Sequence, residues 1–407
     1  MENNVLLQTE FREELRHILD YWARYAPDNE HKGFYGQLTN DNQVVPGAIK
    51  GAVLNARILW SFSAGYNLGM DPAGGRKEGS SYLNMAGRAL SYIMEHFIDK
   101  EYGGVYWSVT AGGEPADTKK QVYAIAFVIY GLAEYYRAQP MQEALDLAIR
   151  LYQDIETYSY DVQRGGYIEA LTRDWQPIAD LRLSEKDANE KKTMNTHLHI
   201  LEAYTNLYRV WPEPALAERI GGLIRVFREH IVDARTGHLR LFFSEDWTVR
   251  SNIISYGHDI EAAWLLGEAA EVVGDAVLIR EVQELSLRIA LAAGEGLNAD
   301  GSMRYEWDGR EMVDERHWWV QAEAMVGFLY AALLTGEAHF YRKFKAVWEY
   351  TKQYIIDREK GEWFWGRLAD GTIMGAPGKV GFWKCPYHNS RACIEVVRRL
   401  GSAPVWR

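Results

Sequence analysis

Gln121-Val-Tyr-Ala-Ile-Ala-Phe-Val-Ile-Tyr-Gly131 is the stretch that decides the fold. Almost every position in it is apolar, so a helix made from it has no face suited to water and is predicted to be buried on all sides. The stretch Phe11-Arg-Glu-Glu-Leu-Arg-His-Ile-Leu19 has the opposite character, with apolar residues on one helical stripe and charges on the other. These two kinds of helix alternate along the chain, which indicates an inner and an outer layer.

Apolar periodicity predicts about twelve helices. We place them at residues 8–25, 50–69, 81–97, 119–138, 141–157, 195–209, 214–230, 257–273, 276–293, 317–335, 338–355 and 387–400. Short links follow the even-numbered helices, whereas long connections follow the odd-numbered ones. This alternation predicts an all-α fold, an (α/α)6 barrel of six helical hairpins with long aromatic-rich loops on one face. Functional side chains are expected at that face.

Composition favours one domain, which we place at residues 1–407. The chain is 47% hydrophobic, enough for a large core. No Pro/Gly/Ser-rich tract or charge block marks a linker. The net charge of −11 argues against a nucleic-acid partner, because phosphate backbones are bound by basic stripes.

The sequence also predicts where in the cell the protein is found and how it assembles. The first residues lack the basic start and apolar stretch of a signal peptide, and no apolar run approaches the roughly 20 residues that span a bilayer. We therefore expect a cytoplasmic protein with no membrane partner, and a monomer or weak dimer. Cys385 and Cys393 are the two cysteines, and their spacing on or near one predicted helix suits neither a disulfide nor a metal site.

Six polar or aromatic residues stand at regular intervals near the starts of the even-numbered helices. They are Arg57, Tyr123, His199, His258, Trp319 and His388, separated by 66, 76, 59, 61 and 69 residues. Such intervals match one helical hairpin plus a long connection, so each repeat is predicted to aim one side chain at a common point. The long loops add glycine-aromatic runs such as Gly103-Gly-Val-Tyr-Trp107, and aromatic rings there can stack on sugar faces.

Neighbours on the same helices extend this set. Asn195 lies four residues before His199 and shares its helix face, whereas His197 points to a different side. His258 and Glu261 are three residues apart and can form a hydrogen bond, which would fix the imidazole tautomer and tune its pKa. His258 is therefore a candidate acid or base.

Trp319 and Glu323 pair a stacking surface with a carboxylate that can accept sugar hydroxyls, and His388 lies where the last inner helix begins. A lone helical histidine is most often a hydrogen-bonded core residue or a cap. A metal site is a further alternative, because His-x-His and His-x-x-Glu resemble ligand sets. We expect no metal, since Arg57 and tryptophans face these histidines and a cation beside a metal would cost affinity.

Four motifs, in order along the chain, resemble the N-acylglucosamine 2-epimerase superfamily. They are Asn195-Thr-His-Leu-His-Ile-Leu-Glu-Ala-Tyr204, Ser255-Tyr-Gly-His-Asp-Ile-Glu261, Trp318-Trp-Val-Gln-Ala-Glu-Ala324 and Lys384-Cys-Pro-Tyr-His-Asn-Ser-Arg-Ala392. The resemblance runs from about Gly33 to Arg398. The double tryptophan followed by Val-Gln-Ala-Glu is most similar to the group that acts on β-1,4-linked disaccharides. The stretch from Asp174 to Lys192 has no counterpart in this pattern that we can place.

The resemblance implies a cofactor-independent epimerase that inverts C2 of the reducing-end glucose of a β-1,4-linked disaccharide. Cellobiose would give glucosyl-mannose and lactose would give epilactose, with longer cello- or manno-oligosaccharides as further candidates. Proton removal beside the aldehyde of the opened sugar forms a cis-enediolate, and a proton then returns to the opposite face. Matching positions imply that His258 and His388 are the acid/base pair, one of which also assists ring opening. Arg57 and His199 would stabilise the enediolate oxygen.

The same match implies the residues that bind the sugar. Hydroxyls would be oriented by four residues, Tyr123, Asn195, Glu261 and Glu323. Trp319 and Trp383 would stack on the rings, whereas Trp318 would serve the second ring or belong to the core.

Two other classes of function stay open. An aldose-ketose isomerase or a monosaccharide or N-acylglucosamine 2-epimerase of the same superfamily shares the enediolate. A glycoside hydrolase or a sugar-binding barrel shares the fold. A hydrolase, however, needs two carboxylates flanking the scissile bond, where this chain has histidines. The physiological disaccharide, and which histidine serves which face of C2, are not determined by the sequence.

Overall fold

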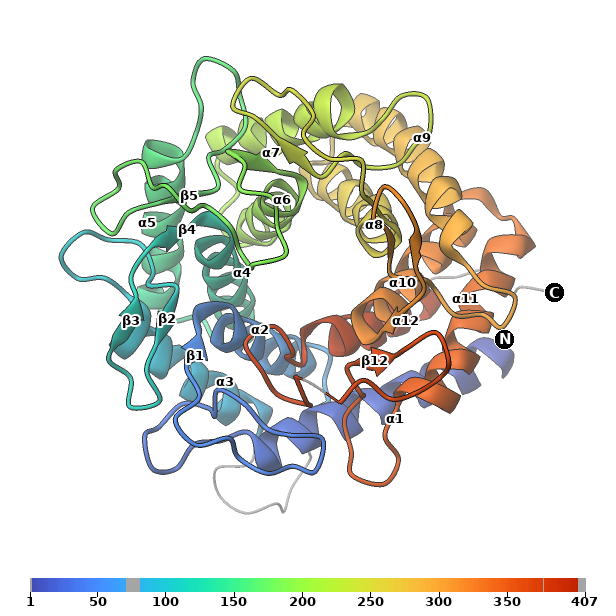
Figure 1. Ribbon diagram of the computed structural model, residues 1–407, viewed down its shortest axis with the longest axis horizontal. Helices are drawn as coiled ribbons and strands as arrows, with labels where there is room; N and C mark the ends of the chain where they lie inside the picture. Colours follow the sequence, from blue (N-terminus) through green and yellow to red (C-terminus); the bar gives the residue numbers. More distant parts are fainter. Residues whose placement is uncertain (1, 71–80, 376, 402–407) are drawn as a thin grey trace.

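Twelve α-helices form a closed double ring in the computed structural model, which describes residues 2–70, 81–375 and 377–401 (Figure 1). Their bounds are α1 Glu2–Tyr25, α2 Ala52–Asn67, α3 Tyr82–Tyr92, α4 Val122–Ala138, α5 Gln142–Tyr158, α6 Met194–Tyr208, α7 Pro214–Val226, α8 Tyr256–Val273, α9 Ala276–Ala293, α10 Trp318–Thr335, α11 Ala338–Tyr350 and α12 Tyr387–Gly401. π-Helical turns extend α3, α7 and α11 (Ile93–Phe97, Phe227–Ile231 and Thr351–Ile355), and a 3-10 turn, Gly294–Gly296, follows α9. The predicted helices, the all-α class and the (α/α)6 barrel are confirmed.

The even-numbered helices make the inner ring. Each packs against the next, and α12 packs against α2 to close the circle. Every residue from Ala52 to Gly65 in α2, and from Val122 to Tyr135 in α4, is buried, as expected for helices with no polar face. Glycines let these helices touch closely: a Cβ at Gly131 would lie 2.8 Å from the Ala56 carbonyl oxygen on α2.

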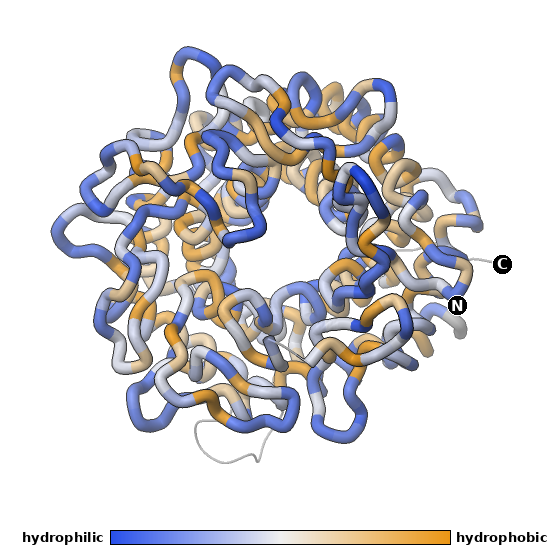
Figure 2. The backbone as a smooth tube through the Cα atoms, in the orientation of Figure 1, coloured by the Kyte–Doolittle hydropathy of each residue, from blue (hydrophilic) through white to orange (hydrophobic). Residues whose placement is uncertain are grey.

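The odd-numbered helices make the outer ring and bury one stripe each. In α5 this stripe includes Ala144, Ala148, Leu151 and Ile155, which recur at helical spacing. Helix α1 packs against α12, so the first and last helices of the chain lie side by side. Hydrophobic residues are concentrated in the helices, whereas hydrophilic residues dominate the loop tips (Figure 2).

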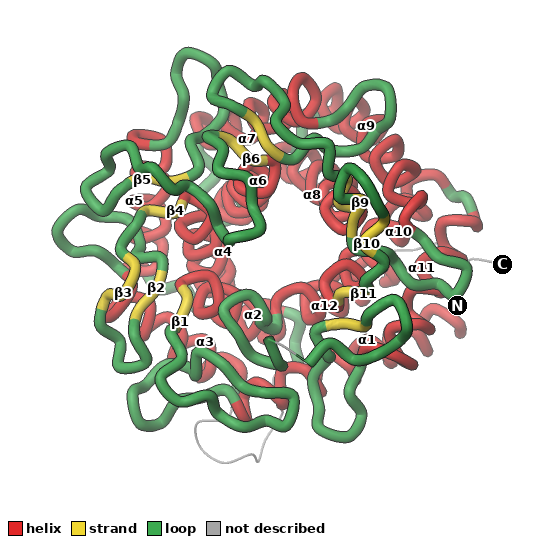
Figure 3. The backbone as a smooth tube through the Cα atoms, in the orientation of Figure 1, coloured by secondary structure: helices red, strands yellow, loops and turns green. Residues whose placement is uncertain are grey.

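The long connections gather at one end of the barrel, as predicted (Figure 3). They carry strands of two or three residues: β1 Lys50–Gly51, β2 Ser108–Val109, β3 Pro115–Asp117, β4 Lys120–Gln121, β5 Ala170–Leu171, β6 Lys192–Thr193, β7 Phe242–Phe243, β8 Ile254–Ser255, β9 Glu306–Trp307, β10 Met312–Val313, β11 Arg316–His317 and β12 Gly366–Arg367. Five antiparallel ladders (β1–β2, β4–β5, β6–β7, β8–β9 and β11–β12) join the strand entering one inner helix to the loop before the next. These ladders connect neighbouring loops around the loop end of the barrel.

Buried lysines also connect these loops through ion pairs. The Nζ atoms of Lys50, Lys120 and Lys192, each just before an inner helix, lie 2.7 to 2.8 Å from an aspartate in the turn after the preceding outer helix. Lys379 repeats this arrangement with Asp357 before α12. Each Nζ also donates to a carbonyl oxygen of the same turn. An ammonium this deeply buried is tolerated only when paired, so these contacts help to fix the chain before four of the six inner helices.

Among the residues that the structure describes, no helix has both the length and the apolar character needed to cross a membrane.

Candidate active site

A cavity of about 600 Å³ lies at the loop end of the inner ring. Ten of the eleven predicted site residues line it: Arg57, Tyr123, Asn195, His199, His258, Glu261, Trp318, Trp319, Trp383 and His388. The regular spacing in the sequence thus corresponds to side chains that converge on one space. The eleventh, Glu323, lies beneath the lining.

Two histidines from different inner helices face this cavity. His258 belongs to the first turn of α8 and His388 to that of α12. The ring of Trp319 lies between them, with its centroid 4.8 Å from the His258 ring and 5.7 Å from the His388 ring. Burial lowers the pKa of His258 to about 3 and holds the pKa of His388 well below its usual range. Both imidazoles are therefore neutral near pH 7.

The hydrogen-bond partner of His258 differs from the predicted one. Its Nδ1 lies 2.8 Å from the Oγ of Ser255, the residue directly before α8, and not against Glu261. Glu261 turns instead toward Arg391, whose Nη2 lies 2.5 Å from its Oε1. The prediction failed because helical spacing shows which residues share a face of one helix. It does not show that Arg391, from another helix, competes for Glu261.

The other oxygen of Glu261 has no hydrogen-bond partner among the described residues, although it is buried. Burial, with repulsion from Glu323, raises the pKa of Glu261 to about 7. An unpaired buried carboxyl oxygen at the cavity wall is costly, and a sugar hydroxyl could satisfy it.

Glu323 contacts His388 and not the cavity. Its Oε1 lies 2.7 Å from the His388 Nδ1, and its Oε2 accepts a 3.1 Å hydrogen bond from the Trp264 Nε1. Both oxygens of this fully buried carboxylate are thus engaged by protein. These contacts favour a role in orienting His388, whereas the sequence predicted contact with sugar hydroxyls.

Arg57, on the neighbouring helix α2, places a buried positive charge at the cavity wall. Its Nη2 donates to the Tyr123 hydroxyl at 2.8 Å, and its guanidinium stacks 4.1 Å from the centre of the Phe127 ring. Nearby, the Nδ1 of His199 lies 2.9 Å from the Oε2 of Glu202. A fixed cation and an oriented imidazole in one low-dielectric cavity can stabilise a developing oxyanion.

The donor set does not fit a metal ion. Ligand-type atoms of Glu261, Glu323 and His388 lie within 4.8 Å of one another. Arg391 already contacts both of these carboxylates, at 2.5 and 2.7 Å. A metal ion in this cluster would have to displace a buried guanidinium.

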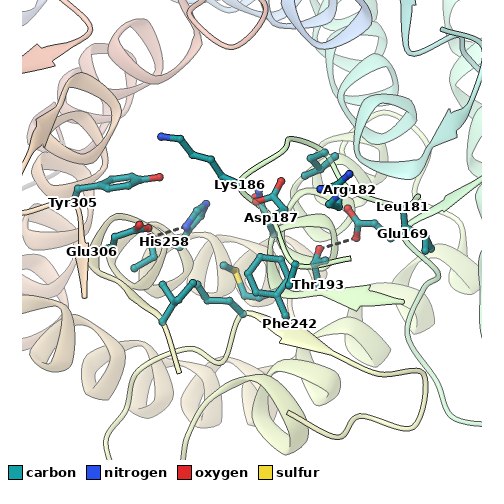
Figure 4. A pocket seen from close by; sticks show the side chains of 17 residues that line it. Glu169, Leu181, Arg182, Lys186, Asp187, Thr193, Phe242, His258, Tyr305 and Glu306 are labelled. Carbon is teal, nitrogen blue, oxygen red and sulfur yellow. Dashed lines mark hydrogen bonds between the residues drawn. The ribbon is translucent and has the colours of Figure 1, made fainter. Parts of the chain in front are cut away.

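Sequence reasoning missed a loop that covers one side of the cavity. Residues 183–187, between β5 and β6, line the cavity together with Tyr305. A side chamber of about 110 Å³ opens beside it and shares six lining residues with it: Leu183, Lys186, Asp187, Asn195, His258 and Tyr305. Figure 4 shows Lys186 extending above His258 toward Tyr305, with Asp187 beside it. Nothing in the sequence pattern signals this loop, because its contacts are with residues far along the chain.

Two buried residues behind the histidines were also missed, although a signal existed. Glu202 follows His199 by three residues and Arg391 follows His388 by three, the same spacing that drew attention to Glu261.

Comparison with known proteins gives a consistent picture. The family model of N-acylglucosamine 2-epimerase (GlcNAc 2-epimerase) matches residues 33–392. The chain is 51% identical over 395 residues to a cellobiose 2-epimerase from Bacteroides fragilis, covering 96% of this chain and 99% of the relative. The solved structure of a cellobiose 2-epimerase from Bacillus thermoamylovorans superimposes with a TM-score of 0.90 at 42% identity, over 97% of this chain and 99% of that one. A D-mannose isomerase structure has the same fold at 19% identity, with a TM-score of 0.81 over 96% of this chain and 97% of that one.

Proposed function

The chain belongs to the N-acylglucosamine 2-epimerase family, and we propose that it inverts C2 of the reducing-end glucose of β-1,4-linked disaccharides. Cellobiose becomes glucosyl-mannose, and lactose becomes epilactose. One observation carries the proposal beyond family likeness: two neutral imidazoles, His258 and His388, face one cavity on either side of Trp319. Inverting a carbon by proton transfer needs an acid/base group on each of its faces.

The histidine pair performs the proton transfers. One imidazole removes the C2 proton of the opened sugar, and the other, carrying a proton in the working state, returns one to the opposite face. One of the two also assists ring opening. In His258 the Nδ1 is bonded to Ser255, which leaves the Nε2 for this work in the cavity. Burial makes each ring a weak base, and the negative charge of the enediolate raises the affinity of both rings for protons.

Arg57 and His199 stabilise the enediolate. Arg57 is buried and its guanidinium is held by Tyr123 and Phe127, so its charge needs no reorganisation as the oxyanion forms. Three carboxylates of the described residues line the cavity, Glu185, Asp187 and Glu261. Glu261 is already bound to Arg391, and the other two lie together on the loop at residues 183–187, so they do not form the opposed pair on both sides of a glycosidic bond that a hydrolase requires.

The second sugar ring lies toward the loop side of the cavity. A volume of about 600 Å³ falls within the range of small-molecule sites and exceeds what one hexose fills. Trp383 offers a ring face on one side, and Lys186 and Asp187 offer polar groups on the other.

Product analysis tests this proposal. The protein is incubated separately with cellobiose, lactose, glucose, mannose and N-acetylglucosamine, and the sugars are resolved by chromatography. The proposal expects mannose-type reducing ends from the two disaccharides. Ketose as the main product would assign an aldose-ketose isomerase, and free glucose from cellobiose would assign a hydrolase.

A further inference from the structure

Arg391, on α12, joins three inner helices beneath the cavity. It is 1% exposed, and its guanidinium contacts one carboxylate on each of α6, α8 and α10. Its Nη2 lies 2.5 Å from the Oε1 of Glu261 and 2.7 Å from the Oε1 of Glu323, and its Nη1 pairs with Glu202. The rings of Trp264 and Tyr387 lie on the guanidinium at 4.8 and 4.2 Å.

We propose that Arg391 is a positioning residue that fixes the tautomer of His388 by keeping Glu323 ionised, and that it also orients His199 through Glu202. The inference rests on the proposed function, because it assigns His388 a proton-accepting atom that must face the sugar. Glu323 lies 2.7 Å from the Nδ1 of His388, and Glu202 lies 2.9 Å from the Nδ1 of His199. One guanidinium therefore acts on two imidazoles, although it touches neither.

The ionisation of a carboxyl decides which ring nitrogen carries the proton. An ionised carboxylate can only accept, so the Nδ1 beside it must carry the hydrogen and the Nε2 keeps its lone pair for the cavity. A protonated carboxyl can donate to Nδ1 instead. The imidazole proton then moves to Nε2, and the atom facing the sugar becomes a donor that cannot remove the C2 proton.

Arg391 counters the tendency of these carboxyls to take up protons. Burial raises the pKa of Glu323, and the guanidinium is the largest influence opposing it. For Glu202 the same guanidinium overcomes burial, with help from His199 and Tyr387, and lowers the pKa to about 2. Without Arg391, three buried carboxylates would face one another with no cation between them.

Several other charged and titratable groups surround this cluster, but Arg391 is the cation that directly contacts all three carboxylates. The groups that interact electrostatically with Arg391, His388 or the three carboxylates are Arg57 on α2, Tyr130 on α4, His199 on α6, His258 on α8 and Tyr387 on α12. Arg57 is engaged with Tyr123 and Cys385.

The wild-type protein gives the first test, through the 15N chemical shifts of its labelled imidazoles. Signals of His388 and His199 are assigned by comparison with His388→Gln and His199→Gln. The inference expects a protonated Nδ1 and an unprotonated Nε2 in His388 at pH 7, and a protonated Nδ1 in His199. A protonated Nε2 with a bare Nδ1 in His388 overturns it. No substrate is involved, so this result stands even if the protein fails to epimerise cellobiose, and that failure would overturn only the proposed function.

Variants give the second test. Arg391→Met removes the charge but keeps most of the side-chain length, and Arg391→Lys keeps the charge but has a single nitrogen in place of the fork. Arg209→Met is the matched control, since Arg209 pairs with Glu268 and contacts neither Glu202 nor Glu323. We expect Arg391→Met to shift the tautomer of His388 toward protonated Nε2 and to lower kcat about 100-fold, with KM changed less than about threefold. Arg391→Lys should fall between it and the wild type.

Circular dichroism reports folding of each variant. A folded Arg391→Met protein with wild-type tautomers and kcat would overturn the inference. If Arg391→Met does not fold, Arg391→Lys decides: unchanged tautomers together with unchanged kcat would count against the inference, and a partial shift of both would support it.

Discussion

The Nδ1 of His388 lies 2.7 Å from the Oε1 of Glu323, a carboxylate with no exposed surface. The contact joins α12 to α10 and directs the remaining ring nitrogen at the sugar cavity. We expect Glu323→Gln to lower kcat by about 10- to 100-fold with little change in KM, because the amide does not stabilise the imidazolium. Steady-state kinetics with cellobiose checks this. Glu134→Gln neutralises another buried carboxylate on α4 and should leave kcat unchanged; equal losses in both variants would point to general destabilisation.

His388→Ala and His258→Ala should each reduce epimerisation to background, since each removes the proton-transfer group on one face of C2. His388 is also bonded to Glu323 and packs against the ring of Trp319, so circular dichroism must show that each variant is folded. Product formation from lactose measures the effect, with His339→Ala on α11 as a surface control. Retained activity in either variant would show that the acid/base assignment is wrong.

The two adjacent tryptophans are expected to respond differently. Trp319 lies against both histidines, and Trp319→Leu should raise KM for cellobiose by about 10-fold, as expected for lost ring stacking. Trp318 is 2% exposed and its ring lies 4.3 Å from that of Trp365, so Trp318→Leu should chiefly lower the melting temperature. Kinetics and calorimetry on the same two variants separate the roles. An unchanged melting temperature with a raised KM for Trp318→Leu would assign it to the second sugar ring.

Lys186 and Asp187 provide a test of disaccharide recognition. If they contact the second ring, Lys186→Ala and Asp187→Asn should each raise KM for cellobiose several-fold. This is the effect expected from the loss of one hydrogen bond to a charged group. Exchange on free glucose, where it can be measured, should be unaffected. Equal effects on both sugars would place these residues at the reducing end.

Stability should fall on acidification below pH 6.5, partly because of His197. This histidine is fully buried; its Nε2 accepts from the Tyr167 backbone N–H, and burial lowers its pKa to about 4. The unfolded chain therefore binds more protons than the folded chain between pH 6.5 and 4, so stability is lost as pH falls through that window. The contribution is on the order of 3 kcal/mol. Urea unfolding at a series of pH values measures it. His197→Gln should flatten the slope, and an unchanged slope would contradict this origin.

Much of the fold was predictable because its signals are local. A helix without a polar face, such as that beginning at Val122, must be buried wherever it occurs, and a striped helix such as α5 must lie outside it. Helix α1 begins at Glu2, earlier than predicted, because Leu7 extends the buried stripe of Phe11 and Leu15 toward the N-terminus.

The site was predictable as a set of residues but only partly as a set of contacts. Regular spacing identified the side chains that converge, whereas the partner of Glu261 depends on Arg391, which comes from another helix. The loop at residues 183–187 reaches the cavity through long-range packing that no periodicity encodes.

The incorporation of solvent deuterium tests the central claim most directly. Cellobiose is incubated in D2O with the wild-type protein and with His388→Ala, and the reducing-end C2 position is followed by proton NMR. We predict loss of the C2 proton signal from the glucose form, together with growth of a mannose-type reducing end deuterated at C2, in the wild type alone. Epimerisation without deuterium at C2, or exchange that persists in His388→Ala, would contradict proton transfer by this histidine pair.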